Sequence, residues 1–232
     1  MILFEHVGLR YGIGPEVLSD INFTLHPGSF HFLSGASGAG KTSLMRLLYL
    51  GRRPTRGLVT MFGDNVASLN RDQLARMRQR IGVVFQDFRL IDHLSTFDNV
   101  ALPLRLQGMS EKQIRVNVEE LLEWVGLGDH MRALPNTMSG GQQQRIAVAR
   151  AVITKPRLLL ADEPTGNLDE EIGMRLMGLF EQLNKMGTTI VIATHDNHII
   201  EEFNYPRLML SAGSLEVKEP VSWIKRKIEN VF

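Results

Sequence analysis

The sequence predicts an α/β domain, in which helices cover both faces of a parallel sheet and a helical lobe interrupts the core. Three observations carry this prediction. Short apolar runs at 81–86, 157–162 and 188–194 are typical of buried strands. Helical patterns separate these runs, as expected of a parallel sheet. The length of 232 residues suits one large α/β domain, or one with an inserted lobe.

The N-terminal part of the chain, residues 2–34, has a different pattern from the α/β part that follows it. Residues 2–34 are expected to be rich in β-structure, with turns at 12–15 and at 26–28, where glycine and proline cluster. Residues 29–34, with the sequence SFHFLS, are expected to form a short strand.

Between 87 and 145 the only strong pattern is helical. Ser110 and Gln113 form a candidate capping box. Gly126 and Gly128 are expected to end the helix that follows it. The apolar residues of this helix recur at helical spacing and are Ile114, Val118, Leu121, Leu122 and Val125.

Composition excludes several classes of protein. The net charge of +1 gives no general attraction for nucleic acid. The absence of cysteine excludes disulfides and cysteine metal sites, and it fits a reducing compartment. The N-terminus does not resemble a signal peptide, and no apolar run reaches the ~18 residues that span a bilayer. We therefore expect a soluble protein that would serve a membrane only through a partner.

The stretch SGASGAGKTS at 34–43 predicts a phosphate site. It contains the P-loop pattern G-x-x-x-x-G-K-T from Gly35 to Thr42, between an expected strand and an expected helix. The Lys41 ammonium is expected to reach the β- and γ-phosphates, and the Thr42 hydroxyl to hold Mg²⁺. The backbone N–H groups form an anion nest at the start of the helix. The residues expected to bind nucleotide here are Ser37, Gly38, Ala39, Gly40, Lys41, Thr42 and Ser43.

Two acids and a second helix start extend this prediction. Asp162 and Glu163 end the apolar run LLLADE, where open α/β sheets place their sites. Asp162 is expected to help hold Mg²⁺, and Glu163 to polarise the attacking water. Ser139 is a good N-cap, and the glycines after it leave a helix start open for an anion. One P-loop in a chain has no evident need of this second anion site.

These motifs, in this order, resemble the ABC-transporter ATPase family. MSGGQ is similar to the family's signature motif LSGGQ, with Met138 differing at a packing position. Gln86 is similar to the Q-loop glutamine and His195 to the switch histidine. Asn167-Leu168-Asp169 is similar to the D-loop, and Tyr11 to the aromatic residue that stacks on adenine. The resemblance covers about residues 2–215.

The resemblance implies a fold and a mechanism. The fold is a P-loop NTPase core with an antiparallel β subdomain and an inserted α-helical subdomain, the ABC nucleotide-binding domain. Two ATPase subunits pair head to tail, and each ATP lies between one P-loop and the other subunit's signature helix. Ser139, Gly140, Gly141, Gln142 and Asp169 would then bind nucleotide across the dimer. The catalytic residues implied are Glu163, His195, Gln86 and Lys41, with Thr42, Gln86 and Asp162 around Mg²⁺.

The segment after Gln86 suggests a branch of the family. The sequences FQD at 85–87 and DNVA at 98–101 are similar to the ATPases of bacterial cell division. This implies an FtsX-type integral membrane subunit, docked in a groove around 87–105, and a peripheral location at the cytoplasmic face of the inner membrane. The output would be regulation of cell-wall hydrolysis.

Domain limits follow from the extent of the resemblance. Residues 1–218 are assigned to the ATPase domain, with its helical subdomain at about 87–150. Residues 219–232 form a basic amphipathic tail. This tail either packs as a C-terminal helix or contacts anionic lipid or a cytoplasmic division-ring protein.

Three alternatives stay open at this stage. The first is an ATPase of a lipoprotein-release or macrolide-efflux system, against which only residues 87–105 argue. The second is a soluble ABC protein of DNA repair or translation, which the near-neutral charge disfavours. The third is a P-loop kinase, which the signature motif disfavours.

Overall fold

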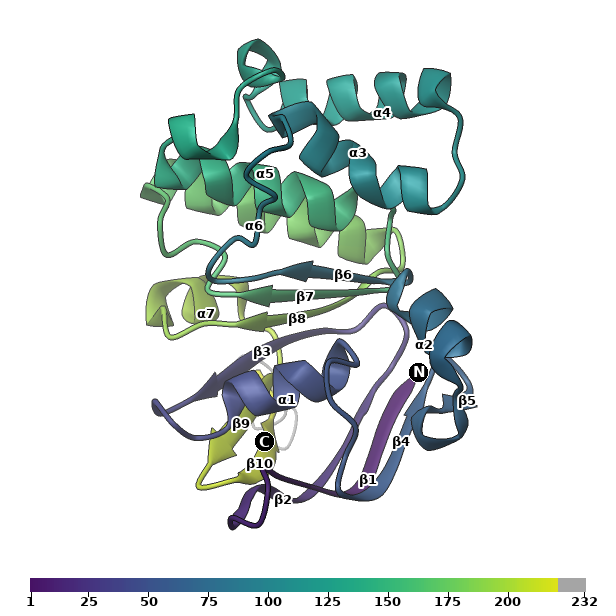
Figure 1. The fold of residues 1–232 in the computed structure, drawn as a ribbon. Coiled ribbons are helices and arrows are strands. Elements are labelled where there is room, and N and C mark those ends of the chain that lie inside the picture. Colours follow the sequence, from purple (N-terminus) through teal and green to yellow (C-terminus); the bar gives the residue numbers. More distant parts are fainter. Residues whose placement is uncertain (221–232) are drawn as a thin grey trace. The chain divides into compact units, whose positions relative to one another are not determined.

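The computed structural model describes residues 1–220, which divide into two compact units. The first unit contains Met1–Ala75 and the chain from Thr189 onward, and the second contains Arg76–Thr188. Figure 1 shows the strands and helices of each unit.

The first unit holds most of the strands. Its elements are β1 (Ile2–Arg10), β2 (Glu16–Leu25), β3 (Phe30–Gly35), α1 (Lys41–Leu48), β4 (Arg56–Met61), β5 (Asp64–Asn65), a 3₁₀ turn (Val66–Ser68), β8 (Thr189–Ala193), α7 (Asn197–Phe203), β9 (Arg207–Ser211) and β10 (Ser214–Lys218). Helix α2 (Arg71–Arg78) leads along the chain into the second unit.

An antiparallel sheet forms the N-terminal part of this unit. Its strand order is β2-β1-β4-β5, and Phe4 of β1 faces Phe23 of β2 in register. Their rings stack with centroids 4.6 Å apart, a geometry that adds to the free energy of burial. The expected β-rich character of residues 2–34 is thus confirmed.

Strand β3 lies between β8 and β9 and is parallel to both. Phe30 to Leu33 are all buried, so side chains on both faces of this strand are covered, as is typical of a parallel sheet. This explains why SFHFLS lacks the alternation of an exposed strand. The expected strands at 29–34 and 188–194 are therefore confirmed, and each of their ends differs by one residue from the expected one.

A histidine lies within this buried strand. His31 is 8% exposed, and its Nδ1 has no hydrogen-bond partner among the described residues. Burial lowers the pKa of His31 to about 4, and the nearby His26 acts in the same direction. Since the unfolded pKa is about 6.5, the unfolded chain binds more protons than the folded chain between these two values. Stability from the neutral imidazole is complete above pH ~6.5 and is lost as the pH falls toward the folded pKa.

Replacing His31 by phenylalanine is expected to remove this pH dependence. Between pH 7.5 and pH 5, the wild type should lose about 2 kcal/mol more unfolding free energy than His31→Phe, as the shift in pKa requires. Urea unfolding at both pH values measures the difference. His198→Phe, at an exposed position, is the control. It should lose as much unfolding free energy between the two pH values as the wild type does. Parallel curves for the wild type and His31→Phe would contradict the prediction.

The second unit combines two strands with the helical lobe. Its elements are β6 (Ile81–Val84), α3 (Thr96–Leu106), α4 (Glu111–Trp124), two 3₁₀ turns (Gly128–His130 and Pro135–Thr137), α5 (Gly140–Val152), β7 (Leu158–Asp162) and α6 (Glu170–Lys185). Strands β6 and β7 are parallel. Gly82 is required in β6, because a Cβ there would collide with the carbonyl oxygen of Ala151 at the end of α5.

Helices α3, α4 and α5 share one hydrophobic core. Its buried members are Val100, Ala101, Leu104, Ile114, Val118, Leu122, Val125, Leu127, Met138, Ile146 and Ala149. Full burial of each larger side chain contributes about 1.5–3 kcal/mol. The predicted apolar face of α4 is confirmed, and Met138 lies at the packing position that was expected of it. Gly126, with a φ of 69°, follows the end of α4.

The predicted capping box at the start of α4 is wrong in detail. Ser110 is the N-cap residue, but its side chain makes no capping bond to the backbone. Instead its hydroxyl donates to the Gln113 side-chain oxygen at 2.8 Å. The two polar side chains satisfy each other and leave the backbone N–H groups of the first turn to other partners.

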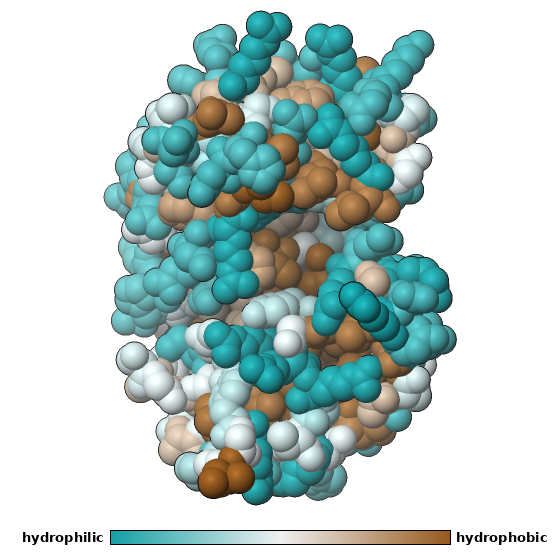
Figure 2. All heavy atoms as spheres, viewed as in Figure 1, coloured by the Kyte–Doolittle hydropathy of each residue, from teal (hydrophilic) through white to brown (hydrophobic). Residues whose placement is uncertain are grey.

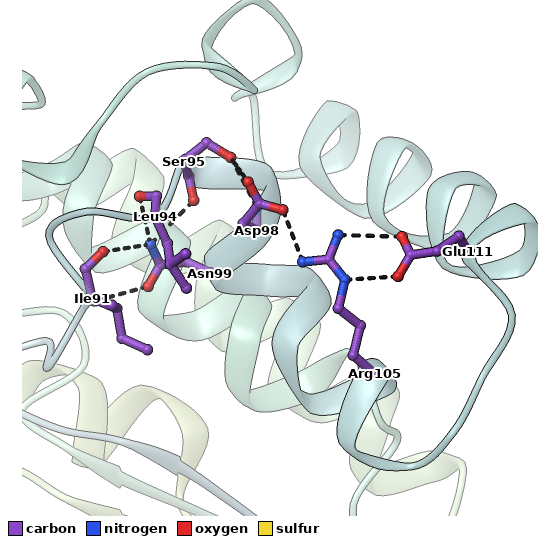
Figure 3. Close-up of polar contacts among 7 residues, drawn as sticks. All are labelled: Ile91, Leu94, Ser95, Asp98, Asn99, Arg105 and Glu111. Atoms are coloured by element: carbon purple, nitrogen blue, oxygen red, sulfur yellow. Dashed lines mark hydrogen bonds and ion pairs between the residues drawn. The ribbon is translucent and has the colours of Figure 1, made fainter.

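One buried amide fixes the chain that enters α3. Asn99 is fully buried, and its Nδ2 donates to the carbonyls of Ile91, Leu94 and Ser95 at 3.1, 3.0 and 3.1 Å. Its Oδ1 accepts from the Ile91 N–H at 2.9 Å (Figure 3). Asn99 therefore supplies the backbone partners that the irregular segment before α3 lacks.

An ion-pair network joins α3 to the start of α4. The Arg105 guanidinium contacts Asp98 and Glu111, each at 2.8 Å (Figure 3). Hydrogen bonding from Ser95, together with Arg105, lowers the pKa of Asp98. Because these side chains are partly exposed, the pairs add little to stability and mainly fix geometry.

Hydrophobic side chains also remain exposed on this unit. They include Leu106, Val116, Trp124 and Met186. Figure 2 shows hydrophobic atoms interrupting a mostly hydrophilic surface. A hollow of about 470 Å³ is lined by the ends of α3, α5 and α6 and by α4, and Leu104 is the residue of the segment 87–105 that lines it.

Candidate functional site

The loop between β3 and α1 has the backbone that a phosphate cradle needs. Gly35, Gly38 and Gly40 have φ values of 151°, 78° and 109°, which side chains with a Cβ resist. A Cβ at Gly35 would collide with the carbonyl oxygen of Leu210, and one at Gly40 would lie 2.8 Å from a methyl group of Leu18. The glycines are therefore needed both for conformation and for room.

The start of α1 is open to an anion. Gly40 is its N-cap and supplies no side-chain cap, and the first turn has no acidic residue. The Lys41 ammonium donates to the carbonyls of Gly35 and Ala36 at 2.6 and 3.1 Å. It thus lies over the loop itself, while Thr42 is exposed at the helix start. Free N–H groups, the helix dipole and a cation meet at this point.

Tyr11 lies against the same helix. Its hydroxyl is 3.1 Å from the Ser43 hydroxyl and accepts a 3.4 Å hydrogen bond from Arg46. The Arg52 guanidinium lies 5.6 Å from the centroid of the Tyr11 ring. Ser43 is buried and bonded to Tyr11, so its side chain is a support for the loop. The two arginines were missed by sequence reasoning, because no local pattern links them to position 11.

The strand register brings His195 to the P-loop edge. Leu33 of β3 faces Ala193 of β8 in parallel register, and the Thr194 N–H donates to the Leu33 carbonyl at 3.2 Å. Gly35 and His195 each follow this pair by two residues. They therefore lie at the same carboxyl edge, where open sheets bind ligands, and the His195 side chain is exposed there.

In the second unit the register of β6 and β7 brings Gln86 to the same edge as two acidic residues. Val84 faces Ala161, so Gln86 and the pair Asp162-Glu163 follow these strands at one edge. Gln86 is exposed and both acids are half-buried. Glu163 has a φ of 48°, an unusual conformation for glutamate that is common at functional sites.

Helix α5 opens with a complete capping box. The Ser139 hydroxyl accepts from the Gln142 N–H at 3.3 Å, and the Gln142 side chain accepts from the Ser139 N–H at 2.9 Å. The first turn has no acid, and Ser139 and Gly140 are exposed. Gln142 also contacts the His130 imidazole at 3.3 Å. The helix start is therefore rigid and open to an anion.

The predicted D-loop lies beside this helix start. A Cβ at Gly141 would lie 3.3 Å from the Asn167 carbonyl oxygen. The Asp169 carboxylate caps α6 by accepting from the Ile172 N–H at 2.9 Å. Asp169 thus has a structural role, whatever it binds in addition.

The structure thus brings the predicted residues together in three groups. Tyr11, the P-loop and His195 belong to the first unit. Gln86, Asp162 and Glu163 meet at the edge of β6 and β7 in the second unit. The start of α5 and the D-loop form the third group, also in the second unit. Among residues 1–220, no cluster of three histidine or acidic side chains could hold a metal ion.

A family profile described as ABC transporter matches residues 18–166. The match includes the P-loop, the α5 start and the acidic strand end. This chain belongs to the ABC transporter family. It is an ATPase of this family, and the predicted fold of an ABC nucleotide-binding domain is confirmed.

Relatives of known name support a narrower placement in the ABC family. The chain is 42% identical to the cell division ATP-binding protein FtsE of Escherichia coli K12 over 215 residues, 93% of this chain and 97% of that protein. It is 44% identical to FtsE of Mycobacterium tuberculosis over 216 residues, 93% and 94% of the two chains. FtsE of Bacillus subtilis is 38% identical over 86% of this chain and 88% of its own. The predicted resemblance to this branch is confirmed.

Solved ABC cassettes have the same fold. A dimeric post-hydrolysis state of the ATP-binding cassette MJ0796, bound to ADP and phosphate, matches with a TM-score of 0.89 and 34% identity. It covers 95% of this chain and 99% of that one. A second dimeric structure of MJ0796 gives the same TM-score at 35% identity.

Two predictions concern membranes. Within the described residues, no helix is long and apolar enough to cross a bilayer. The predicted amphipathic character of the tail at 219–232 concerns residues 221–232 above all, and these lie outside the described part of the chain.

Proposed function

We propose that this chain is the ATP-hydrolysing subunit of a bacterial cell-division system. It acts as a homodimer in its ATP-bound state and drives an FtsX-type membrane subunit that regulates cell-wall hydrolysis. It lies at the cytoplasmic face of the inner membrane through that subunit. Support comes from relatives named as cell division proteins over about nine-tenths of the chain.

One observation supports the dimer most directly. Two helices, α1 and α5, start with glycines, have no acid in the first turn, and are open to an anion. One nucleotide on one P-loop needs only α1. A head-to-tail pair gives the second helix start a ligand, because Ser139, Gly140 and Gly141 would contact the γ-phosphate held by the partner subunit.

We assign to each residue the role that the family resemblance implies for it. Lys41 balances charge on the phosphates, and Glu163 accepts a proton from the attacking water. His195 holds the γ-phosphate and orients that water. Tyr11 stacks on the adenine with the face of its ring that Arg52 leaves open.

Mg²⁺ fits the donor atoms of this chain. Thr42, Gln86 and Asp162 offer a hydroxyl, an amide oxygen and a carboxylate, the oxygen ligands that Mg²⁺ accepts beside phosphates. When bound, the ion balances charge on the β- and γ-phosphates.

The membrane partner is tested by purification from native membranes. We expect the tagged chain, extracted in mild detergent, to carry an FtsX-like subunit with a large extracytoplasmic domain. A permease of lipoprotein release or efflux would overturn the cell-division role and keep the ATPase mechanism. Recovery without any membrane protein would overturn both the partner and the peripheral location.

A further inference from the structure

An arginine of α5 donates hydrogen bonds to the loop that follows Gln86. Arg150 lies near the end of α5, and its Nη1 and Nη2 donate to the carbonyls of Arg89 and Phe88, both at 2.6 Å. Arg150 is half-buried, and burial lowers the pKa of Arg150. Among the described residues no carboxylate pairs with it. Its charge is therefore directed at two backbone carbonyls.

The backbone that accepts these hydrogen bonds is strained. Phe88 and Arg89 have φ values of 57° and 48°, two consecutive left-handed residues without a glycine. This conformation costs roughly 1–2 kcal/mol for each residue. Arg89 also stacks over the Phe85 ring at 4.0 Å and contacts Asp87 at 3.1 Å. Within the turn, the Phe88 N–H donates to the Phe85 carbonyl at 3.0 Å and the Arg89 N–H to the Asp87 carbonyl at 2.6 Å. The two charged hydrogen bonds from α5 are the restraint that comes from outside the turn.

We propose that Arg150 is a positioning residue that holds this turn and thereby sets where Gln86 lies relative to the signature helix. The inference rests on the proposed function, in which Gln86 and the start of α5 both act on ATP. Arginine suits the role because its rigid fork reaches two carbonyls at once, whereas a lysine ammonium is a single point charge.

Arg145 provides a matched control on the same helix. Its Nη1 donates to the carbonyls of Val125 and Gly126 at 2.8 and 3.3 Å. Arg145 therefore makes the same kind of contact, from the same helix, to a loop that is far along the chain from Gln86. Arg145→Met and Arg150→Met remove comparable hydrogen bonds, and only the second releases the turn after Gln86.

Kinetics of the full-length protein with its membrane partner test the role. We expect Arg150→Met to lower kcat about 10- to 100-fold, the loss typical of a misplaced reactive geometry, with KM for ATP changed less than about 2-fold. Arg150→Lys should recover part of the rate, and Arg145→Met should keep it. Hydrogen exchange should rise at residues 85–91 in Arg150→Met and stay unchanged there in Arg145→Met.

A second-site variant separates positioning from general stability. Glycine adopts the left-handed conformation without steric cost. The double variant Phe88→Gly/Arg150→Met should therefore have a kcat about 3-fold or more above that of Arg150→Met alone. Unchanged kcat for Arg150→Met, or unchanged exchange at 85–91, would overturn the inference alone. Absence of turnover in the wild-type complex would instead count against the proposed function.

Discussion

Replacement of Glu163 by glutamine is expected to lower kcat for ATP hydrolysis by about 100-fold or more, the usual contribution of a general base. Glutamine keeps the size of the side chain and one acceptor oxygen, but it cannot accept a proton from water. Glu163 lies just beyond the carboxyl end of β7 in a left-handed conformation, which aims it away from the strand path. ATP binding should persist, so the variant should accumulate as an ATP-bound dimer, measured by phosphate release and by size-exclusion chromatography with ATP.

The matched control is Glu170→Gln. Glu170 is an exposed glutamate in the first turn of α6, and its replacement should leave both the rate and the oligomeric state unchanged. A Glu163→Gln variant that hydrolyses ATP near the wild-type rate would show that the base has been assigned to the wrong residue.

Replacement of Lys41 by alanine is expected to weaken ATP binding and to lower kcat/KM by about 100-fold, the scale for losing one charged donor at developing phosphate charge. In the described structure Lys41 bonds only to the carbonyls of Gly35 and Ala36, which leaves its charge uncompensated over the loop. A titration with a fluorescent ATP analogue measures binding, and phosphate release measures turnover.

Lys112→Ala tests whether the loss of any positive charge would weaken ATP binding and lower kcat/KM. Lys112 is exposed on α4, and its removal should change neither binding nor turnover. Unchanged ATP affinity in Lys41→Ala would remove the lysine from the phosphate site, and circular dichroism of both variants excludes unfolding as the cause of any loss.

Much of the fold could be predicted because its strands are continuous apolar runs. The strands at 30–35, 158–162 and 189–193 are almost entirely buried, and the strand at 81–84 alternates between buried and half-buried residues. Each is a short apolar run whose signal needs no knowledge of its neighbours. The start of α5 was also predictable, since an N-cap serine before two glycines is a local feature.

Other features depended on contacts that no local pattern records. Helix α3 was not placed in the sequence, because it contains Pro103 and proline ordinarily ends a helix. The buried Asn99 reads as an ordinary surface residue until the irregular chain before α3 supplies its partners. Arg150 meets a loop more than sixty residues earlier in the chain.

The order of the motifs in the sequence predicted the residues of the candidate site. The strand register explains how residues distant in the sequence come to lie at the ends of paired strands. Parallel pairing puts Gly35 and His195 at the carboxyl ends of β3 and β8. It puts Gln86 and Glu163 at the carboxyl ends of β6 and β7, and long stretches of sequence separate the members of each pair. Asp169 shows the limit of motif reasoning, because its carboxylate caps a helix in the structure.

Helix α5 has a mechanical consequence. It is 13 residues long, or about 20 Å, and arginines at two levels tie it to the end of α4 and to the turn after Gln86. A helix of this length is stiff, so a force on its glycine end cannot be absorbed locally. We therefore expect a displacement of the serine-glycine start to reach the turn after Gln86 through Arg150.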